Sequence, residues 1–398
     1  MKKFPKFFKK PGNEWEDNLW SSSHPRIYPI LKFIARGKPV IRVPFVGLIV
    51  SDAEIMKSIL MNPVFSKVGK GVSSTLWTPI TGPTALINMD GPSHMLLRRK
   101  LGPIFSPRAI STLSATIMQE PLERMAGQLA AGESIDVVEY VAQIAGSMIC
   151  GLTGLDPSDK AVSETVDKAR ELTAQASLKG TLTDSQVEYS RNLLASLTQP
   201  VIDAYNRGDT NTVPGRMKEL GLSQEEAVGA SSAFIIAGTE TVISYIPRMV
   251  ALILESGWLE KLNEDPERMN DVIREGLRLT VPTPVMLRSV TEDTEVSGRK
   301  VKKGRRTILM TVLACQNLER GDEFDPDRPI PAAIGQIWFG AGSHFCIGMP
   351  LAMEQTTAFL KTLMKSAETG KIIIEARTAR THTFAPSYET LIIRKECK

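Results

Sequence analysis

Hydrophobic residues recur three and four positions apart through most of the chain, a spacing that places them on one face of an α-helix. Ser223 and Glu226 stand at the two positions of a capping box, which predicts the start of the longest helix. Ser51 or Asp52 is a candidate N-cap for an earlier helix. In chain order, the main predicted helices cover 111–130, 136–154, 158–178, 186–206, 223–255, 266–280 and 347–368.

Segments rich in β-branched and aromatic residues lie only toward the two ends of the chain. Residues 39–50 and 371–394 predict hairpins, and residues 284–312 turn to strand character. Residues 66–92 hold many Gly, Ser, Thr and Pro and predict a long connection that is functional or mobile. The fold class that follows is mainly α with small β-sheets, an α+β protein built as one helix-rich domain.

The first 25 residues predict an irregular N-terminal tail, which leaves 26–398 for the single domain. The tail is basic, because its first ten residues hold no acid. They hold five lysines: Lys2, Lys3, Lys6, Lys9 and Lys10. Since the whole chain carries a net charge of +4, the rest of it sums to −1. Nucleic-acid binding needs a basic face across the fold, and we therefore do not expect it.

Composition is that of an ordinary globular protein, with 42% hydrophobic and 23% charged residues over 398 positions. The four cysteines stand far apart without a C-x-x-C pair, which argues against zinc fingers and redox dithiols. So few cysteines fit a reducing compartment, and we expect a cytoplasmic protein. The most apolar stretch, 227–254, contains Glu240, Pro247 and Arg248, which favours a buried helix over a transmembrane anchor.

The sharpest local signal is the segment FGAGSHFCIG, from Phe339 to Gly348. Gly340, Gly342 and Gly348 surround one cysteine, Cys346, just before a predicted helix. Glycine permits unusual backbone angles and the close approach of a flat ligand. N–H groups at a helix N-terminus stabilise a thiolate, and a thiolate is a metal ligand. The alternative for the same residues is a glycine-rich turn around an inert buried cysteine.

This segment resembles the haem-binding signature of the cytochrome P-450 haem-thiolate monooxygenases, F-G-x-G-x-H-x-C-x-G, at every fixed position. The resemblance implies haem b as cofactor, held between the long central helix and the helix after Cys346, with Cys346 as axial metal ligand and O2 as co-substrate. A thiolate ligand pushes electron density into the iron and favours O–O cleavage. Phe339 would pack near the sulfur, His344 would reach a haem propionate, and Gly340 and Gly348 would complete the cofactor-binding loop.

A second match is the pair Glu275 and Arg278, three positions apart and so on one helix face. Alone, such a pair indicates no more than a surface ion pair. Beside the cysteine motif it resembles the family's buried Glu-x-x-Arg pair, completed by a downstream arginine, here Arg328. Pro329 stands where the family usually has Phe, and the segment from there to Phe339 is shorter than usual. The implied role of this triad is structural support for the cysteine loop.

A third match lies inside the long apolar helix, from Ala237 to Thr241. A glycine and a threonine there weaken the helical hydrogen bonding and leave room for a small ligand. The segment resembles the family pattern [AG]-G-x-[DE]-T, which places Ala237 and Gly238 against the haem. Glu240 and Thr241 then match the catalytic acid–alcohol pair that supports dioxygen activation. Alone, the segment is equally a packed helix with one tolerated acid. Pro247 should kink or open the helix beyond this site.

A fourth match concerns the two carboxylates of a haem, which need cations. His94 and Arg98 are four positions apart on one helix face and resemble the family's propionate-binding His-x-x-x-Arg pair. Arg288 matches a third propionate-binding position, on the strand after the Glu275 helix. No role is assigned to His24 and His382.

The resemblance also places a distal substrate pocket by position. Its side chains are mainly apolar, so the expected substrate is a hydrophobic small molecule, although each side chain could equally belong to the core. Terpenoid, steroid, fatty acid and natural-product intermediate all stay open. The pocket residues are Val72, Leu76, Trp77, Leu86, Ile87, Phe234, Val285, Met286 and Phe384.

The chain leaves no room for a fused flavin or ferredoxin domain, so electrons are expected from a separate ferredoxin and its reductase. Arg99, Lys100 and Arg108 are candidate docking cations, with a solvated charged face as the alternative. O2-dependent hydroxylation or epoxidation is the first interpretation of function. Peroxide-driven oxygenation or oxidative coupling on the same fold is the second, and a non-catalytic haem sensor or binding scaffold is the third. Glu240 and Thr241 favour the first, because peroxide users often replace this pair, whereas coupling enzymes can keep it.

Overall fold

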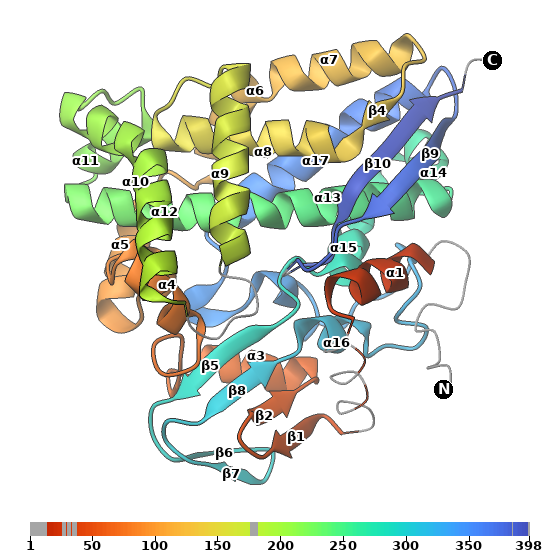
Figure 1. Ribbon diagram of the computed structural model, residues 1–398. Helices are drawn as coiled ribbons and strands as arrows, with labels where there is room; N and C mark the ends of the chain where they lie inside the picture. Colours follow the sequence, from red (N-terminus) through yellow and green to blue (C-terminus); the bar gives the residue numbers. More distant parts are fainter. Residues whose placement is uncertain are drawn as a thin grey trace.

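A computed structural model describes the protein over residues 14–25, 29, 33, 38–175, 182–383 and 385–396. Helices fill the upper and middle parts of the molecule, and small β-sheets lie at its lower end and along one side (Figure 1). The predicted fold class, mainly α with small β-sheets, is confirmed.

The helices share no simple repeat and are joined mostly by short turns. They are α1 (Glu14–Ser23), α3 (Ala53–Met61), α4 (Ser73–Thr81), α5 (Gly91–Leu101), α6 (Pro107–Ile117), α7 (Gln119–Ala130), α8 (Val137–Thr153), α9 (Asp159–Gln175), α10 (Asp184–Arg207), α11 (Val213–Glu219), α12 (Gln224–Gly238), α13 (Glu240–Glu255), α14 (Trp258–Glu264), α15 (Met269–Thr280), α16 (Thr311–Gln316) and α17 (Met349–Ala367). The described part of the chain also contains the short 3-10 helices η1 (Leu86–Asn88), η2 (Pro266–Arg268), η3 (Ile337–Phe339) and η4 (Gly342–His344).

Within the described residues, the strands form three small sheets. One has the order β1-β2-β8-β5-β3, in which β2 and β8 run parallel and the other neighbours run antiparallel. The second has the order β4-β10-β9, and the third is the hairpin β6-β7. The strands are β1 (Val40–Val43), β2 (Gly47–Val50), β3 (Phe65–Ser66), β4 (Ile135–Asp136), β5 (Met286–Val290), β6 (Thr294–Val296), β7 (Arg299–Val301), β8 (Arg306–Leu309), β9 (Ile372–Ala379) and β10 (Tyr388–Lys395).

The long helix predicted over 223–255 is present but divided. The predicted capping box starts it: the Glu226 N–H donates to the Ser223 hydroxyl at 3.1 Å, and the Ser223 N–H donates to the Glu226 carboxylate at 2.8 Å. The helical pattern is interrupted at Thr239, between α12 and α13. α13 continues through Pro247, so the interruption lies within the predicted site and not beyond it.

Residues 14–23 correct the expectation of an irregular tail. They form α1, which buries Leu19 and Trp20 in the main hydrophobic core and places Glu16 against Arg248 of α13. The sequence pattern does not predict this helix, because it is short and mostly polar. The rest of the predicted tail before Glu14 lies outside the described residues.

The predicted long connection over 66–92 is also partly wrong, because it contains α4 and η1. α4 packs against α10 and against η1. Its sequence, SSTLWTPIT, holds Ser, Thr and Pro79, residues that favour helices poorly. Tertiary packing therefore overrides local preference in this segment.

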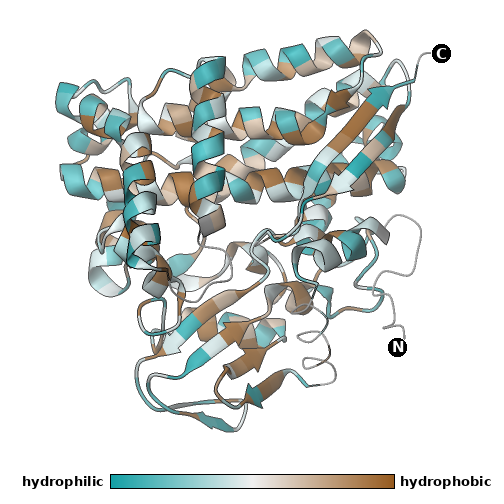
Figure 2. Cartoon of the chain, viewed as in Figure 1, coloured by the Kyte–Doolittle hydropathy of each residue, from teal (hydrophilic) through white to brown (hydrophobic). Residues whose placement is uncertain are grey.

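The central pair α12 and α13 runs through the core, with hydrophobic stretches along its middle (Figure 2). The stretch Gln224–Glu255 is long and apolar enough to cross a membrane, but 72% of its most apolar window is buried inside the molecule. It is thus placed as a core helix. Gly276 lets α15 approach it closely, since a Cβ there would lie 2.6 Å from Cγ of Met249.

Candidate functional site

The cysteine motif forms a tight loop that leads into α17. Gly340 and Gly342 have φ angles of +80° and +67°, in the left-handed region that favours glycine. A Cβ atom on Gly342 would lie 2.6 Å from the Leu60 carbonyl oxygen, so the loop needs glycine there to pack against α3. The Cys346 N–H donates to the Phe339 carbonyl oxygen at 2.8 Å and closes the loop. The motif therefore presents one thiol at the start of a long helix.

The Cys346 thiol stands where protein atoms, N–H donors and cations converge. Burial raises its pKa, whereas the Gly348 and Met349 N–H groups act in the opposite direction. The positive charges of Arg98 and Lys67 also favour the thiolate. The side chain nevertheless has an exposed surface. The sulfur is therefore accessible to a ligand, although protein atoms surround the thiol closely enough to raise its pKa.

The other cysteines differ from Cys346. Cys150 and Cys315 are buried. Burial raises the pKa of Cys315 to about 12 and also raises that of Cys150, so both stay protonated thiols. Cys397 lies outside the described residues. Within the described part of the chain, Cys346 is therefore the thiol that a ligand can reach.

The interruption of the central helix opens a face made of small side chains. The Thr241 hydroxyl donates to the Ala237 carbonyl oxygen at 2.7 Å, and the Thr239 hydroxyl donates to the Ile235 carbonyl oxygen at 3.0 Å. Ala237 is exposed and Gly238 and Thr241 are half-buried, although the residues just before them are buried. The helix thus leaves accessible space beside Ala237, as the sequence pattern implies.

α13 is tied directly to α17, the helix that follows the cysteine. The Tyr245 hydroxyl lies 3.1 Å from the Ala352 carbonyl oxygen and 2.7 Å from the Thr356 hydroxyl. The two helices expected to enclose the haem are therefore held in a fixed relation to one another.

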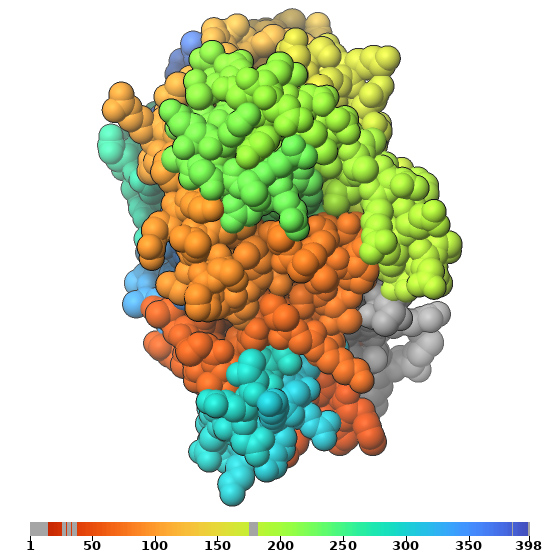
Figure 3. Space-filling model, turned by 90° about the vertical axis from the view of Figure 1, so that its left-hand side faces the viewer, coloured from red at the N-terminus to blue at the C-terminus, as the bar shows by residue number. Residues whose placement is uncertain are grey.

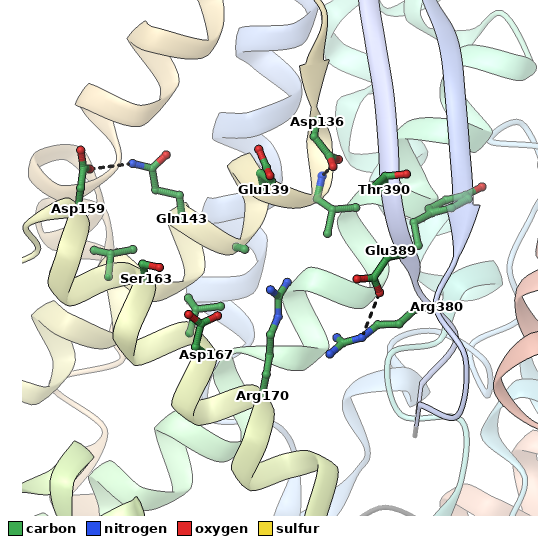
Figure 4. A pocket seen from close by; sticks show the side chains of 15 residues that line it. Asp136, Glu139, Gln143, Asp159, Ser163, Asp167, Arg170, Arg380, Glu389 and Thr390 are labelled. Atoms are coloured by element: carbon green, nitrogen blue, oxygen red, sulfur yellow. Dashed lines mark hydrogen bonds and ion pairs between the residues drawn. The ribbon is translucent and has the colours of Figure 1, made fainter.

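Glu240, the acid of the predicted pair, is held by two arginines. Its Oε1 lies 3.4 Å from Nε of Arg170 on α9, and its Oε2 lies 3.3 Å from Nη1 of Arg380, just after β9. Glu389 on β10 lies 3.5 Å from Nε of Arg380. Both arginines line a surface pocket of about 470 Å³ between α8, α9 and β10, which they enter from different walls (Figure 4). The two arginines therefore connect the Glu240 carboxylate to the molecular surface.

Three cations gather on the cysteine side of the molecule. Arg288 is only 5% exposed, and its Nη1 donates to the Leu287 carbonyl oxygen at 2.9 Å. Burial lowers its pKa to about 10, and no acid lies within ion-pair distance among the described residues. Arg98 donates to the Phe345 carbonyl oxygen at 2.6 Å. Burial, then Arg288 and Arg98, lower the pKa of Lys67 to about 8. The site therefore concentrates positive charge that the described acids leave largely unpaired.

The two predicted histidines stack on each other, with ring centroids 4.2 Å apart. His344 Nε2 lies 3.0 Å from Asp90 Oδ1. Burial lowers the pKa of both histidines, that of His94 to about 3, so both are mostly neutral near pH 7. Burial raises the pKa of Asp90, but hydrogen bonds from His344, Ser66 and the Gly91 N–H outweigh it and hold that pKa well below its usual value. The positive charge of the site therefore comes from arginine and lysine.

These features fit a flat metallo-macrocycle with two carboxylates. No cluster of three His, Cys, Asp or Glu that could hold a metal ion occurs in the described ranges, so a metal on Cys346 must bring its other ligands with it. Arg288 and Lys67 supply charge for carboxylates, and Nδ1 of His94 is buried without a hydrogen-bond partner. Ala237 leaves accessible space. The chain therefore offers a thiolate, cations and an open face for a haem.

The predicted triad forms around Glu275, which is 1% exposed. Arg278 donates to both carboxylate oxygens of Glu275, each at 2.7 Å, and Arg328 Nε lies 3.6 Å from Oε1. The Asp325 N–H donates to the same Oε1 at 3.0 Å. The remaining Arg278 donors reach the carbonyl oxygens of Cys315, Gly321 and Glu323. The triad therefore fastens α15 to the segment that precedes the cysteine loop, despite the unusual Pro329.

The predicted pocket residues differ in how deeply their side chains are buried. Leu76, Trp77, Ile87, Val285 and Met286 are half-buried, and Val72, Leu86 and Phe234 are buried. Trp77 and Ile87 pack on a small hydrophobic cluster of Ile80, Leu172, Leu194 and Ile236. The Phe234 ring packs edge-on against Phe105 at 4.9 Å, as a core residue does. Phe384 lies outside the described residues. The substrate roles of these side chains stay predictions.

Four residues at the site escaped the sequence analysis as functional candidates: Lys67, Asp90, Arg170 and Arg380. Asp90 stood inside the segment that contains His94, and its N-cap position was a usable signal. The other three are lone cations outside every motif, brought to the site by tertiary folding. The chain itself carries no local sign of their positions.

Known proteins are similar to this chain in sequence. A family model described as cytochrome P450 matches residues 267–368. The vitamin D(3) 25-hydroxylase of Pseudonocardia autotrophica is 30% identical over 69% of this chain and 68% of that protein. The erythromycin C-12 hydroxylase of Saccharopolyspora erythraea is 28% identical over 76% of this chain and 77% of that protein.

Solved structures agree as to the fold. P450BioI, in complex with an acyl carrier protein that carries hexadec-9Z-enoic acid, superposes with a TM-score of 0.81 at 20% identity over 94% of this chain and all of that one. Epothilone B-bound P450epoK superposes with a TM-score of 0.80 at 19% identity, covering 96% and 99% of the two chains.

Proposed function

The chain belongs to the cytochrome P450 family of haem monooxygenases, and from that premise we propose that it inserts oxygen from O2 into a hydrophobic small molecule at a site built on Cys346. The haem, when bound, supplies the activation of dioxygen. The observation that carries the proposal is the accessible Cys346 thiol at the start of α17, with N–H donors and two cations around it. In this account Cys346 is the metal ligand, and the Phe339–Gly348 loop fixes its position.

The cations bind and orient the two carboxylates of the cofactor. Arg98 and Arg288 are the predicted partners, and Lys67 adds a third charge near them. His94 and His344 are mostly neutral, so in this account they contribute hydrogen bonds and packing. Asp90 orients His344 through the 3.0 Å contact.

Glu240 and Thr241 hold and move protons. A proton from solvent reaches the Glu240 carboxylate through the pocket that Arg170 and Arg380 line. From Glu240 it passes through water to Oγ1 of Thr241, which lies on the accessible face beside Ala237. The buried residues around this face exclude bulk water, so protons arrive by this route and not at random.

The substrate class rests on the apolar pocket residues and on the relatives. Two relatives are named as hydroxylases of erythromycin and of vitamin D(3). We therefore propose a hydrophobic substrate of comparable size and a cytoplasmic location for the reaction. Hydroxylation is favoured over peroxide-driven oxidation by the presence of Glu240 and Thr241.

The test is isotopic. Erythromycin, vitamin D(3) and a long-chain fatty acid serve as probes, and those that shift the ferric Soret band to shorter wavelength are incubated with a ferredoxin, its reductase and ¹⁸O2. One ¹⁸O atom in the product supports the proposal. Oxidised or coupled product that lacks the label, or product formed only with added peroxide, would overturn it.

The redox partner is proposed to dock on α5. Met95 and Leu96 are exposed large apolar side chains, and Arg99 lies on the same helix face and is exposed. Lys100 already forms an ion pair within the chain, since its Nζ lies 3.1 Å from Oε2 of Glu226. A small acidic ferredoxin would therefore meet an apolar patch beside Arg99.

Charge reversal separates these residues. Arg99→Glu should weaken ferredoxin binding about tenfold and flatten its dependence on salt. Arg207→Glu, an exposed arginine at the end of α10, is the matched control and should leave binding unchanged. Equal binding by both variants would place the docking face elsewhere.

A further inference from the structure

The lower end of the molecule in Figure 1 combines an apolar tip with a cationic hairpin, and neither takes part in the site described above. The tip is the turn between β1 and β2. Pro44, Phe45 and Val46 are all exposed there, and the Phe45 side chain is fully exposed at 102%. Phe45 has a φ of +62°, a left-handed conformation that costs energy in a bulky residue. A large ring is thus held out in water on a strained turn.

The cationic part is the hairpin β6-β7 and the chain that follows it. Its exposed cations are Arg299, Lys300, Lys302, Lys303 and Arg305, with Arg306 half-buried. The same segment has three acids, Glu292, Asp293 and Glu295, and Asp293 is paired with Lys302 at 2.6 Å. Arg299, Lys300, Lys303 and Arg305 have no acid within ion-pair distance in the described part of the chain. With Arg42 nearby in β1, this end of the molecule carries seven cations against three acids.

Hydrogen bonds join the tip to the hairpin. Arg306 donates to the Val46 carbonyl oxygen from Nε at 3.2 Å and from Nη2 at 3.0 Å. Arg42 donates from Nη2 to the Lys300 carbonyl oxygen. The side view shows the hairpin, in cyan, as the narrow lower end of the molecule (Figure 3). Apolar tip and cations therefore form one projecting surface, which we name the β tip: residues 42–46 and 299–306.

We propose that the β tip docks this protein on an anionic lipid surface. A projecting ring flanked by cations fits an interface at which the ring enters the acyl boundary and the cations meet lipid phosphates and carboxylates. A stable protein interface needs about 800 Å² of matched surface on each partner, which a narrow tip supplies poorly. A lipid surface needs no such match. Nucleic acid would use the charge but leaves Phe45 without a role.

The sequence adds a second element of the same chemistry. The first ten residues hold five lysines and three phenylalanines without an acid. With the β tip also cationic, the remainder of the chain is net acidic, since the whole carries only +4. Charge that is concentrated in this way orients a protein toward an anionic surface.

The experiment is co-sedimentation of the full-length holoprotein with phosphatidylcholine vesicles that contain 30% phosphatidylserine, or none. We expect binding to the anionic vesicles that weakens in 0.5 M salt. Lys303→Glu with Arg305→Glu should lower it at least about 25-fold, from roughly fivefold for each lost cation. Phe45→Ser should lower it about tenfold. The control Lys361→Glu with Lys365→Glu, exposed cations on α17, makes the same charge change and should have little effect.

Each outcome bears on the proposal. The proposal is overturned if the wild-type protein does not co-sediment with anionic vesicles. Binding that survives the β-tip variants and disappears only when residues 1–10 are deleted overturns it too, because the tail alone would then dock. Equal binding to a DNA duplex that Phe45→Ser leaves unchanged assigns the surface to polyanions and also overturns it. Haem content and melting temperature of each variant confirm that it is folded.

Discussion

Two carboxylate–arginine clusters stand at different depths in this molecule. Glu275 and Arg278 are 1% and 0% exposed, joined by two hydrogen bonds of 2.7 Å. Glu240, Arg170 and Arg380 are each about a quarter exposed, with contacts of 3.3 and 3.4 Å. Among the described residues, Oε1 of Glu240 and Nε of Arg170 find no hydrogen-bond partner. The same chemical groups therefore form two different arrangements. We name Glu275 and Arg278 the closed cluster, and Glu240, Arg170 and Arg380 the loose cluster.

The difference follows from the energetics of charge. A buried pair has lost its hydration, so the removal of one partner leaves an unpaired charge in a poor solvent. A pair near the surface can break and form again at little cost, because water replaces the partner. The closed cluster suits a scaffold for the cysteine loop. The loose cluster suits an acid that must exchange protons.

The largest expected effect comes from the closed cluster. Glu275→Gln leaves the buried Arg278 charge without its partner and should lower the free energy of unfolding by about 3–5 kcal/mol. Urea denaturation measures it. Haem content should fall as well, because the cysteine loop loses its support. The matched control is Asp271→Asn, which breaks the half-buried pairs of Asp271 with Arg268 and Arg274 and should leave the unfolding midpoint nearly unchanged. A midpoint that is equally insensitive to both substitutions contradicts the distinction.

A second buried pair tests whether the effect of losing an ion pair on haem binding depends on its burial alone or on its position in the fold. Glu16 on α1 and Arg248 on α13 are 3% and 0% exposed, and Arg248 also donates to the Thr280 carbonyl oxygen at 2.6 Å. Glu16→Gln should lower the free energy of unfolding by about 3 kcal/mol, because the buried Arg248 charge loses its partner. The spectrum of the bound haem should stay unchanged, since Arg248 donates to Glu16, Thr280 and Pro386, which lie outside the cysteine loop. Altered haem ligation in this variant would show that the two buried pairs are not equivalent.

The loose cluster should affect turnover more than stability. Glu240→Gln removes the carboxylate proposed to carry protons and should slow oxygenation about 100-fold, with reductant diverted to peroxide or water. Stability should change by less than about 1 kcal/mol, because the pairs are partly hydrated. Product formed per reductant consumed is the measurement. Glu389→Gln, which touches Arg380 but not Glu240, is the control and should keep most of the activity.

The smallest expected effect belongs to Asp90, a carboxylate of intermediate depth. Its pKa is depressed in the folded state, so it contributes stability above its unfolded pKa of about 3.9 and loses that contribution as pH falls through the folded value. The Asp90→Asn variant should therefore be less stable than wild type at neutral pH. The difference in unfolding free energy between the two proteins should shrink as the pH falls below about 4. Urea midpoints across pH 3 to 7 measure this. A deficit that is constant across the range would contradict the linkage.

The sequence predicted what depends on local pattern. The cysteine loop, the capping box at Ser223 and the Glu275–Arg278 pair all rest on short spacings, and the structure contains each of them. The helical class follows from the same periodicity. α1 and α4 escaped because their residues favour helices poorly and tertiary contacts stabilise them.

What the sequence did not predict depends on folding at a distance. Arg170 and Arg380 are 210 positions apart, and both reach Glu240. Lys67 stands in an irregular segment and acquires its role only from the charges around it. No spacing rule links such residues, so the motif predicted Glu240 but not its two arginines, whereas Glu275 and Arg278 of the closed cluster stand in one motif.

The central claim is that Cys346 ligates the haem iron through its thiolate. The most direct measurement is the absorption spectrum of the reduced, carbon-monoxide-bound protein. We expect a Soret band near 450 nm. Cys346→Ser should abolish this red-shifted band, whereas Cys315→Ser, at a buried thiol that stays protonated, should keep it. A band near 420 nm in folded wild-type protein, or one that survives Cys346→Ser at 450 nm, would contradict the account.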